Sequence, residues 1–417
     1  MIIQEQVNNL QLNDLEGVMK IRMSSPDLSD ADRQAVNDVV QTPNLSMGPK
    51  IDAFEGAFCE LTGAKNAIGV NSGTAGLHLC IRAADVGLGD IVITTPFSFV
   101  SSTNVILFEK AVPVFVDVDP VTGNIDPEQF SRAVEDLFLG GTAAHRWLPR
   151  HLPPENQGGL KKVKAVLPVD VFGQPADYDP INAVASQYNL QVIEDSCEAL
   201  GGEYKGRYAG TLGDFGVFAF YPNKQITTGE GGMIITDDHA AADFMRALRN
   251  QGRAPGDTWL QHTHLGYNYR LDEMSAALGL SQMARLESLL QNRARVAAWY
   301  AEFLAKIDGV LPPPMVPDTT RVSWFVYVIR VDESIDRDRL AQILTQEGVP
   351  VRPYFAPIHL QPYMVKLFGY QRGDYPVTED LGDRCLALPF SGTMSREEVV
   401  VVCQRIADAL SSAEKQG

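Results

Sequence analysis

One lysine of this chain, Lys224, stands where an amine could act as a nucleophile. It follows the apolar run "FGVFAFY" and precedes the glycine-rich "TTGEGG". An amine nucleophile at neutral pH needs a depressed pKa or a resting state as a Schiff base. A lysine tethered just past a buried strand is what an internal aldimine would need. The alternative is a solvated surface charge beside a turn, which is the common state of a lysine.

A second stretch, "NSGTAGLHL" at residues 71–79, could bind phosphate. A turn that opens a helix offers free backbone N–H groups at the positive end of the helix dipole. Gly73 lets the backbone approach an anion closely, and Thr74 adds a hydroxyl. The alternative is that Ser72 is an ordinary helix N-cap.

A third stretch, "LQVIEDSCEALGG" at residues 190–202, ends an apolar run with Glu194 and Asp195. An acid at a strand end can sit against a protonated ring nitrogen, and the alternative is a cap for the next helix. Glu198 lies three residues further on, so it faces the same way if a helical turn follows.

Seven short apolar runs, bounded by Gly, Pro, Asp or Asn, indicate the strands that must position these groups. They lie at residues 66–70, 90–95, 112–118, 163–169, 190–195, 215–220 and 232–237. Helical patterns lie between several of them, for example at 74–84 and 126–137. In the second of these helices we expect Asp126 as N-cap, Pro127 at the first position and Gln129 closing a capping box.

Alternation of strands and helices predicts an α/β fold with a mostly parallel, seven-stranded sheet flanked by helices. In such sheets ligands bind at the carboxyl ends of the strands. The candidate phosphate-binding turn at Gly73 and Thr74, the acid Asp195 and Lys224 each lie at the end of a strand, in that order along the chain. This is the layout that a pyridoxal 5'-phosphate (PLP) site requires.

The chain is expected to divide into an N-terminal arm (1–30), a large PLP-binding α/β domain (31–252) and a small C-terminal α+β domain (253–417). A Pro- and Gly-rich insertion at about 140–162 interrupts the large domain. It is interpreted as a surface loop that could serve as a lid or a partner contact. The small domain is expected to end in a helix that begins with a Ser395–Glu398 capping box.

The composition of the chain limits the classes of partner that it is expected to bind. The net charge is −17, which argues against nucleic acid or an anionic membrane as the main binding partner. The five cysteines show no paired spacing, so neither a disulfide framework nor a metal site is predicted. No signal-peptide pattern or membrane-length apolar run is present in the sequence, and a cytoplasmic protein is expected.

The chain resembles the DegT/DnrJ/EryC1/StrS family of nucleotide-sugar aminotransferases, which are fold-type-I PLP-dependent enzymes. The resemblance runs from "SMGPKIDAFEGAF" to "CLALPFSGTMS", and its most specific parts are "NKQITTGEGGMIITDD" and "HLGYNYRLDEMSAALGL". It implies that Lys224 carries the aldimine and that Asp195 holds the pyridinium nitrogen. It also implies that the phosphate is bound by Ser72, Gly73 and Thr74.

The resemblance implies further contacts. Phe99 would lie against the cofactor ring, and Glu198 would lie near its 3' oxygen. Asn268 would reach the phosphate of the neighbouring subunit, which implies at least a homodimer. Substrate contacts are expected from Tyr221, Tyr354, His359 and Arg270, although Tyr354 and His359 could equally be packing residues and Arg270 could merely tie the dimer together.

One position departs from the family pattern. Where relatives commonly have a phosphate-binding serine, five residues before the lysine, this chain has Ala219. The hydrogen bond that this serine would donate to the phosphate could be absent here. Alternatively, water or another hydroxyl, such as that of Thr227 or Ser196, could supply it.

The implied reaction moves an amino group from L-glutamate to a keto sugar nucleotide. Glu198 and the segment "RPYFAPIHLQPYM" (352–364) resemble the perosamine-synthase-like branch, which acts on 4-keto-6-deoxyhexoses. An aminocyclitol aminotransferase is an alternative that the sequence separates poorly from this interpretation. Sugar dehydratases of the same fold have histidine in place of the lysine, so Lys224 argues against that activity. The intact set of Lys224, Asp195 and Thr74 argues against a non-catalytic regulator that keeps the fold.

Overall fold

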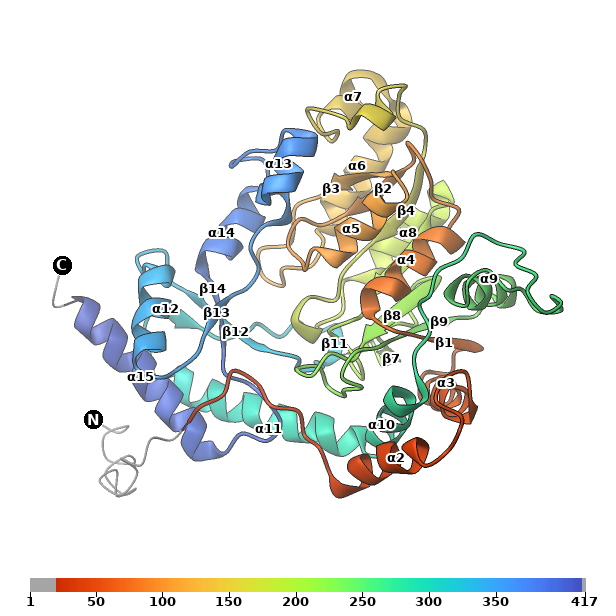
Figure 1. The fold of residues 1–417 in the computed structure, drawn as a ribbon. Helices are drawn as coiled ribbons and strands as arrows, with labels where there is room; N and C mark the ends of the chain where they lie inside the picture. The colour runs from red at the N-terminus through yellow and green to blue at the C-terminus, as the bar shows by residue number, and fades with distance from the viewer. Residues whose placement is uncertain (1–19, 415–417) are drawn as a thin grey trace.

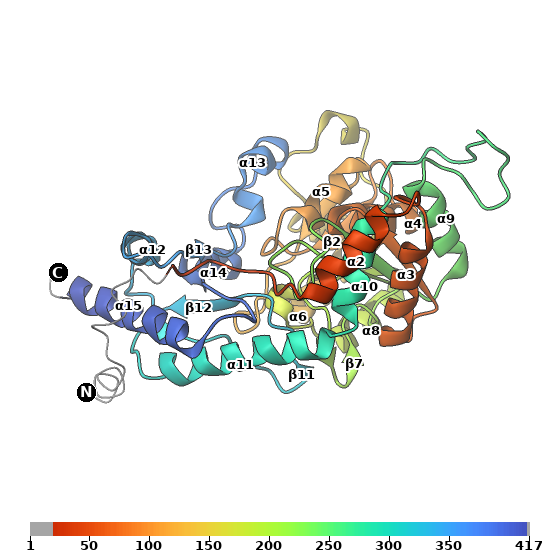
Figure 2. The same ribbon diagram turned by 60° about the horizontal axis from the view of Figure 1, so that its bottom comes forward.

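The computed structural model describes residues 20–414, with side chains to residue 411. Most of the predicted N-terminal arm, residues 1–19, lies outside the described residues. A large sheet with helices on both faces forms one side of the molecule, and a smaller sheet with its own helices forms the other (Figures 1 and 2). The predicted division of the chain at residue 252 stays a prediction.

The central sheet has seven strands in the order β1-β9-β8-β5-β4-β2-β3. Neighbours pair in parallel except at β9, which is antiparallel to both β1 and β8. The predicted α/β fold with a mostly parallel sheet is therefore confirmed, and each of the seven apolar runs supplies one strand. The strands are β1 (Asn66–Val70), β2 (Ile91–Thr94), β3 (Val112–Phe115), β4 (Val163–Leu167), β5 (Gln191–Asp195), β8 (Phe215–Ala219) and β9 (Gly232–Thr236).

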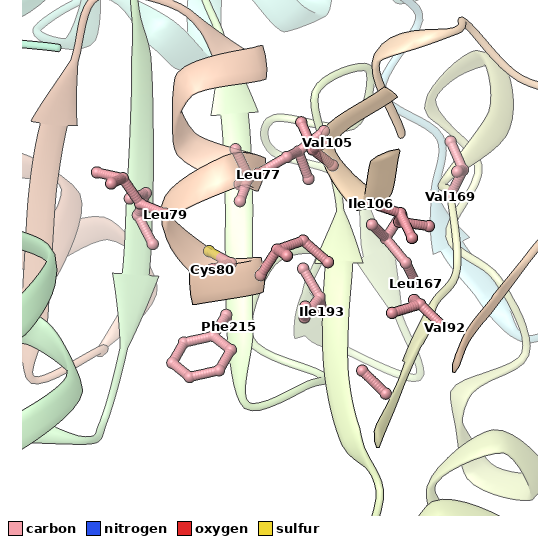
Figure 3. Packing of buried hydrophobic residues seen from close by; sticks show 14 of the residues in the cluster. Leu77, Leu79, Cys80, Val92, Val105, Ile106, Leu167, Val169, Ile193 and Phe215 are labelled. Carbon is pink, nitrogen blue, oxygen red and sulfur yellow. The ribbon is translucent and has the colours of Figure 1, made fainter. Parts of the chain in front are cut away.

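Helices cover both faces of this sheet because its strands are apolar on both sides. Val92 packs on the side of α4, whereas its neighbours Ile91 and Ile93 pack on the side of α6. Figure 3 shows side chains of α4 and α5 packed against strand residues such as Ile193 and Phe215. One face carries α4 (Gly73–Ala83), α5 (Ser101–Phe108) and α9 (His239–Arg249); the other carries α3 (Pro49–Thr62), α6 (Pro127–Leu139), α8 (Tyr178–Tyr188) and α10 (Glu273–Met283).

The second sheet is antiparallel, in the order β10-β12-β14-β13, and packs against three helices. Its elements are β10 (Val310–Leu311), β12 (Tyr327–Val331), β13 (Arg352–Pro353), β14 (Cys385–Leu388), α11 (Leu286–Leu304), α12 (Arg337–Gln346) and α15 (Arg396–Glu414). The other α-helices of the described residues are α2 (Asp30–Val40), α7 (Gly141–His145), α13 (Pro362–Phe368) and α14 (Pro376–Arg384). A small sheet consists of β6 (Glu203–Tyr204), β7 (Arg207–Tyr208) and β11 (Thr319–Arg321). Short 3-10 helices lie at η2 (Pro154–Asn156), η3 (Val171–Gly173) and η4 (Ile358–Leu360). Among residues 20–414, no helix is long and apolar enough to cross a membrane.

The two predicted capping boxes differ in outcome. The Ser395–Glu398 box is confirmed, since each side chain accepts the other residue's backbone N–H, at 3.2 and 2.8 Å. The prediction of a capping box at Asp126 is correct for one of its two contacts and wrong for the other. Asp126 does cap α6, but the Gln129 amide donates to the Asp126 carboxylate, and the Asp126 N–H bonds to the carbonyl of Asp117 instead.

The 140–162 insertion contains a short helix and is fastened at several points. The Arg150 guanidinium makes two hydrogen bonds to Asp374, and the His151 N–H bonds to the carbonyl of Phe368. At its far end, the Lys161 N–H bonds to the carbonyl of Gly89. The insertion therefore connects the loop before β2 with the segment that carries α13.

A carboxylate distant in sequence caps helix α3. Gly48, the N-cap of α3, has no side chain to accept the first N–H groups. The fully buried Glu273 of α10 accepts three of them, from Gly48, Lys50 and Ile51, at 3.0, 2.8 and 3.1 Å. Glu273 thereby fixes α10 against α3.

Replacing Glu273 with alanine should lower the melting temperature, because three buried donors lose their acceptor. We expect a loss of about 2 kcal/mol or more in unfolding free energy, since a hydrogen bond to a charged group is worth roughly 1.5–3 kcal/mol. Glu302→Ala is the control, because the ion pair of Glu302 with Arg396 is half-exposed and its loss should change little. Equal melting temperatures for Glu273→Ala and wild type would contradict the cap.

Candidate active site

Three sequence features meet at one edge of the central sheet. A Cβ on Gly73, at the start of α4, would stand 2.8 Å from the Cβ of Ala219 at the end of β8. It would stand equally close, 2.8 Å, to the sulfur of Cys197, two residues beyond the end of β5. The N-terminus of α4 therefore lies directly against the carboxyl ends of these two strands, and only glycine allows that approach.

Ser72 is the N-cap of α4, as the alternative interpretation held. Its hydroxyl accepts the N–H of Ala75 at 3.1 Å. This cap is compatible with a phosphate site, because the first N–H groups of a helix have no carbonyl to bind within the helix. Gly73 and Thr74 occupy that first turn, at the positive end of the helix dipole.

Glu194 and Asp195, at the end of β5, have different tasks. Glu194 is fully buried and accepts the N–H groups of the 210–213 loop, so it anchors that loop. The Asp195 carboxylate accepts the N–H of Cys197 at 3.2 Å. Burial raises the pKa of Asp195, while hydrogen bonds from Cys197 and the charge of Lys224 oppose that shift.

The Lys224 amine lies inside the site. Its side chain is 12% exposed, and Nζ lies 3.7 Å from Oε1 of Glu198. Nζ also lies 3.7 Å from the centre of the Phe325 ring, a cation–π distance. These contacts do not fit the alternative of a solvated surface charge.

Glu198 faces Lys224 from the segment that follows β5. Its Oε2 accepts the N–H of Phe172 at 2.9 Å, which fixes the carboxylate beside the amine. Burial raises the pKa of Glu198, and the charge of Lys224 opposes this shift. Tyr354 lies in the same environment: burial and the nearby Glu198 raise its pKa to about 12.

Two predicted contacts are open to solvent. Phe99, just after β2, is 63% exposed, and Tyr221, three residues before the lysine, is 54% exposed. Exposed aromatic rings are suited to contact a bound molecule.

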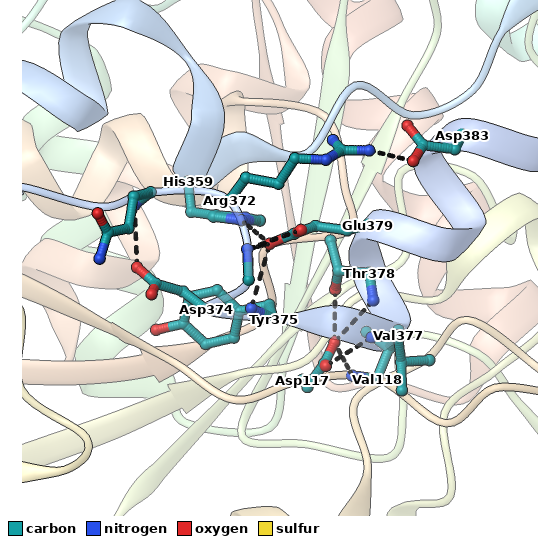
Figure 4. Close-up of polar contacts among 12 residues, drawn as sticks. Asp117, Val118, His359, Arg372, Asp374, Tyr375, Val377, Thr378, Glu379 and Asp383 are labelled. Atoms are coloured by element: carbon teal, nitrogen blue, oxygen red, sulfur yellow. Dashed lines mark hydrogen bonds and ion pairs between the residues drawn. The ribbon is translucent and has the colours of Figure 1, made fainter.

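The structure gives His359 a different role from the predicted substrate contact. The ring is fully buried, and Nε2 lies 3.0 Å from Oε1 of Glu379. Glu379 also accepts the N–H groups of Gly373 and Tyr375, so the histidine belongs to a buried network around α14 (Figure 4). The geometry therefore supports the packing alternative for His359.

Arg270 and Asn268 lie on a segment that runs past the start of α4. Arg270 donates to the side chain of Asn250 at 2.9 Å, which supports a structural role. Asn268 is exposed, and its carbonyl accepts from the side chain of Asn71 at 3.4 Å.

The two hydroxyls suggested as substitutes for the missing serine are already engaged. Ser196 Oγ donates to Asp170 at 2.7 Å, and Thr227 Oγ1 donates to the carbonyl of Phe220 at 2.9 Å. Ala219 therefore leaves the phosphate turn without these two substitutes.

Sequence reasoning missed two phenylalanines: Phe325, whose ring lies by the amine, and Phe172, whose N–H holds Glu198. Nothing in the apolar sequence around Phe325 distinguishes it from a core residue. Phe172 adopts a left-handed backbone conformation, with φ of 58°, that turns its N–H toward Glu198. The following glycine was the one local sign of such a turn.

The chain matches the DegT/DnrJ/EryC1/StrS aminotransferase family over residues 26–407. GDP-perosamine synthase of Caulobacter vibrioides is 35% identical over 383 residues, covering 91% of this chain and 95% of that protein. The spore coat polysaccharide biosynthesis protein SpsC of Bacillus subtilis is 35% identical over 404 residues, covering 94% and 97%. A solved structure of Helicobacter pylori PseC, an aminotransferase involved in the biosynthesis of pseudoaminic acid, matches with a TM-score of 0.82 at 26% identity, covering 94% and 100%.

These matches and the site define a PLP-dependent aminotransferase whose substrates are an amino donor and a sugar. The chain belongs to the DegT/DnrJ/EryC1/StrS aminotransferase family. The residues present fit PLP, because a buried amine, a buried strand-end carboxylate and a close helix N-terminus converge at one place. The predicted fold type and cofactor are thereby confirmed.

Gly73→Ala should weaken PLP binding, because the added Cβ would push the start of α4 away from β8. Loss of one hydrogen bond to a charged phosphate corresponds to at least about a tenfold weaker affinity. Ala219→Ser is the opposite change, since it adds a hydroxyl beside Gly73, and should strengthen binding by about tenfold. Affinity is measured by titrating the apoprotein with PLP.

Gly87→Ala serves as the control for these two variants, because a Cβ there would meet nothing within 4 Å. Unchanged affinity in the Gly73→Ala protein would contradict a phosphate site at the start of α4.

Proposed function

We propose that this enzyme transfers an amino group from L-glutamate to a keto sugar nucleotide, with Lys224 as its catalytic residue. The observation that carries the proposal is the placement of the Lys224 amine, 3.7 Å from Glu198 and just past the end of β8. A lysine with that burial and those neighbours is suited to bind a cofactor aldehyde and to move protons.

When bound, PLP supplies the electron sink for the C–H bond that breaks. Lys224 would hold the cofactor covalently and would be released when the amino donor takes its place. The free amine would then accept the proton from the donor's α-carbon as a general base and deliver it to the cofactor's 4' carbon as a general acid. Because Nζ already lies within the site, this transfer needs no large movement of the chain.

Asp195 and α4 orient the cofactor in this proposal. A protonated ring nitrogen would give the buried Asp195 carboxylate a positive partner, which favours the protonated ring. The first turn of α4, at Gly73 and Thr74, would hold the phosphate. Phe99 would lie against the face of the ring, and Asn268 would reach the phosphate of the second subunit of a homodimer.

A 4-keto-6-deoxyhexose is the sugar we propose. The similarity to GDP-perosamine synthase supports this choice. Tyr221 is exposed enough to contact the sugar.

Lys224→Ala should abolish the conversion of bound PLP to its pyridoxamine form by L-glutamate, because no other amine performs both tasks. The conversion is followed by absorbance in a single turnover. Lys205→Ala is the control, since Lys205 is a half-exposed lysine paired with Asp179 and Asp318. Full conversion in the Lys224→Ala protein would refute the assignment.

The substrate is tested with a panel of GDP-, UDP- and dTDP-linked 4-keto-6-deoxy sugars, supplied with glutamate and followed by product mass. We expect an amino sugar from at least one of these nucleotides. Amination of a keto-cyclitol with no amination of any nucleotide sugar would favour the aminocyclitol alternative instead.

A further inference from the structure

Arg293 of α11 is a buried arginine whose hydrogen bonds all go to main-chain carbonyls. Nη1 donates to Trp324 and Phe325, at 3.2 and 3.1 Å, and Nη2 donates to Asn223 at 3.1 Å and also to Lys224. The residue is 4% exposed. Within the described part of the chain, no carboxylate forms an ion pair with it.

These four carbonyls belong to two segments distant in sequence. One contains Lys224, and the other contains Phe325, whose ring lies under the Lys224 amine. Helix α11 runs from α10 toward α15, so Arg293 reaches both segments from a third element (Figure 2). The guanidinium therefore fixes the main chain of the lysine and of the ring that contacts its amine.

The side chain of Gln225 also links the Lys224 segment to its neighbours. The Gln225 amide donates to the carbonyl of Glu198 at 2.6 Å and to the hydroxyl of Ser323 at 2.7 Å. The Lys224 segment is thus linked on one side to Glu198 and on the other to residues 323–325. Arg293 contributes the larger number of these links.

A buried charge without an ion-pair partner costs folding free energy, so the presence of the Arg293 guanidinium at this place requires a reason. Burial lowers the pKa of Arg293 to about 10, and it stays charged at neutral pH. Arginine is the side chain whose planar fork offers five donors, enough for four carbonyls in two directions. A lysine would keep the charge but could not reproduce this geometry.

We propose that Arg293 is a positioning residue of the amino-transfer reaction, which sets where the Lys224 amine stands relative to Glu198 and Phe325. The proposal rests on the proposed role of Lys224. The amine must return to the same place after each displacement, because it both binds the cofactor and moves the proton. A misplacement of about 1 Å can slow such a step by about 100-fold.

The test compares Arg293→Lys and Arg293→Met with Arg285→Met. Arg285 stands at the start of the same helix and also binds a main-chain carbonyl, that of Asp27, but its hydrogen bonds to the described residues go to Asp27 and Asp32 rather than to the Lys224 segment. Two quantities are measured. One is the single-turnover rate with glutamate; the other is the rate at which acetic anhydride labels Lys224 in the apoprotein across pH, read by peptide mass.

We expect both Arg293 variants to slow the single turnover by about 100-fold and to change the pH profile of Lys224 labelling, with little change in glutamate affinity. Added guanidinium ion should restore part of the rate in Arg293→Met. Arg285→Met should lower the melting temperature alone. If Arg293→Met does not fold, Arg293→Lys, which keeps the charge and most of the length, decides the question.

Wild-type rates and labelling in Arg293→Lys would overturn the proposal. So would a slowed turnover with an unchanged labelling profile, because the amine would then not have moved. The role of Lys224 fails separately: if Lys224→Ala keeps full turnover, the proposed function is wrong whatever the Arg293 variants do.

Discussion

The parallel pairing of β5 with β8 is the constraint on which the site depends. Asp195 lies opposite Val217 in this pairing, so the acid and the strand that leads to Lys224 end at the same edge of the sheet. The start of α4 packs against this edge at Gly73, where an added Cβ would come too close to Ala219 and Cys197. Strand register therefore brings Gly73, Asp195 and the chain that leads to Lys224 to the same edge of the sheet.

Buried carboxylates and one buried arginine then fix the connecting segments. Glu194 holds the 210–213 loop, Glu198 holds the turn at Phe172, and Arg293 holds the lysine segment. In each case a carboxyl or guanidinium group binds main-chain atoms that lie outside the α-helices and β-strands. Such segments need external partners because their own backbone groups form no ladder.

Local patterns in the sequence were enough to predict the central sheet and the position of the lysine, because buried strands and helix starts have short-range signals. The order of Gly73, Asp195 and Lys224 was sufficient for the cofactor class. Side-chain partners were harder to predict. His359 resembled a pocket residue but pairs with Glu379, and Ser196 and Thr227 resembled free hydroxyls but are engaged elsewhere. Glu273 and Arg293 act on segments far away in sequence, which no local pattern reveals.

The central claim, that Lys224 is the residue bound to the cofactor, is tested most directly by chemical mapping. The PLP-loaded enzyme is reduced with borohydride, which makes the link between lysine and cofactor permanent, and its peptides are examined by mass spectrometry. The account predicts that the added cofactor mass lies on the peptide that contains Lys224. Cofactor mass on a different lysine, or on no lysine of a fully loaded enzyme, would contradict it.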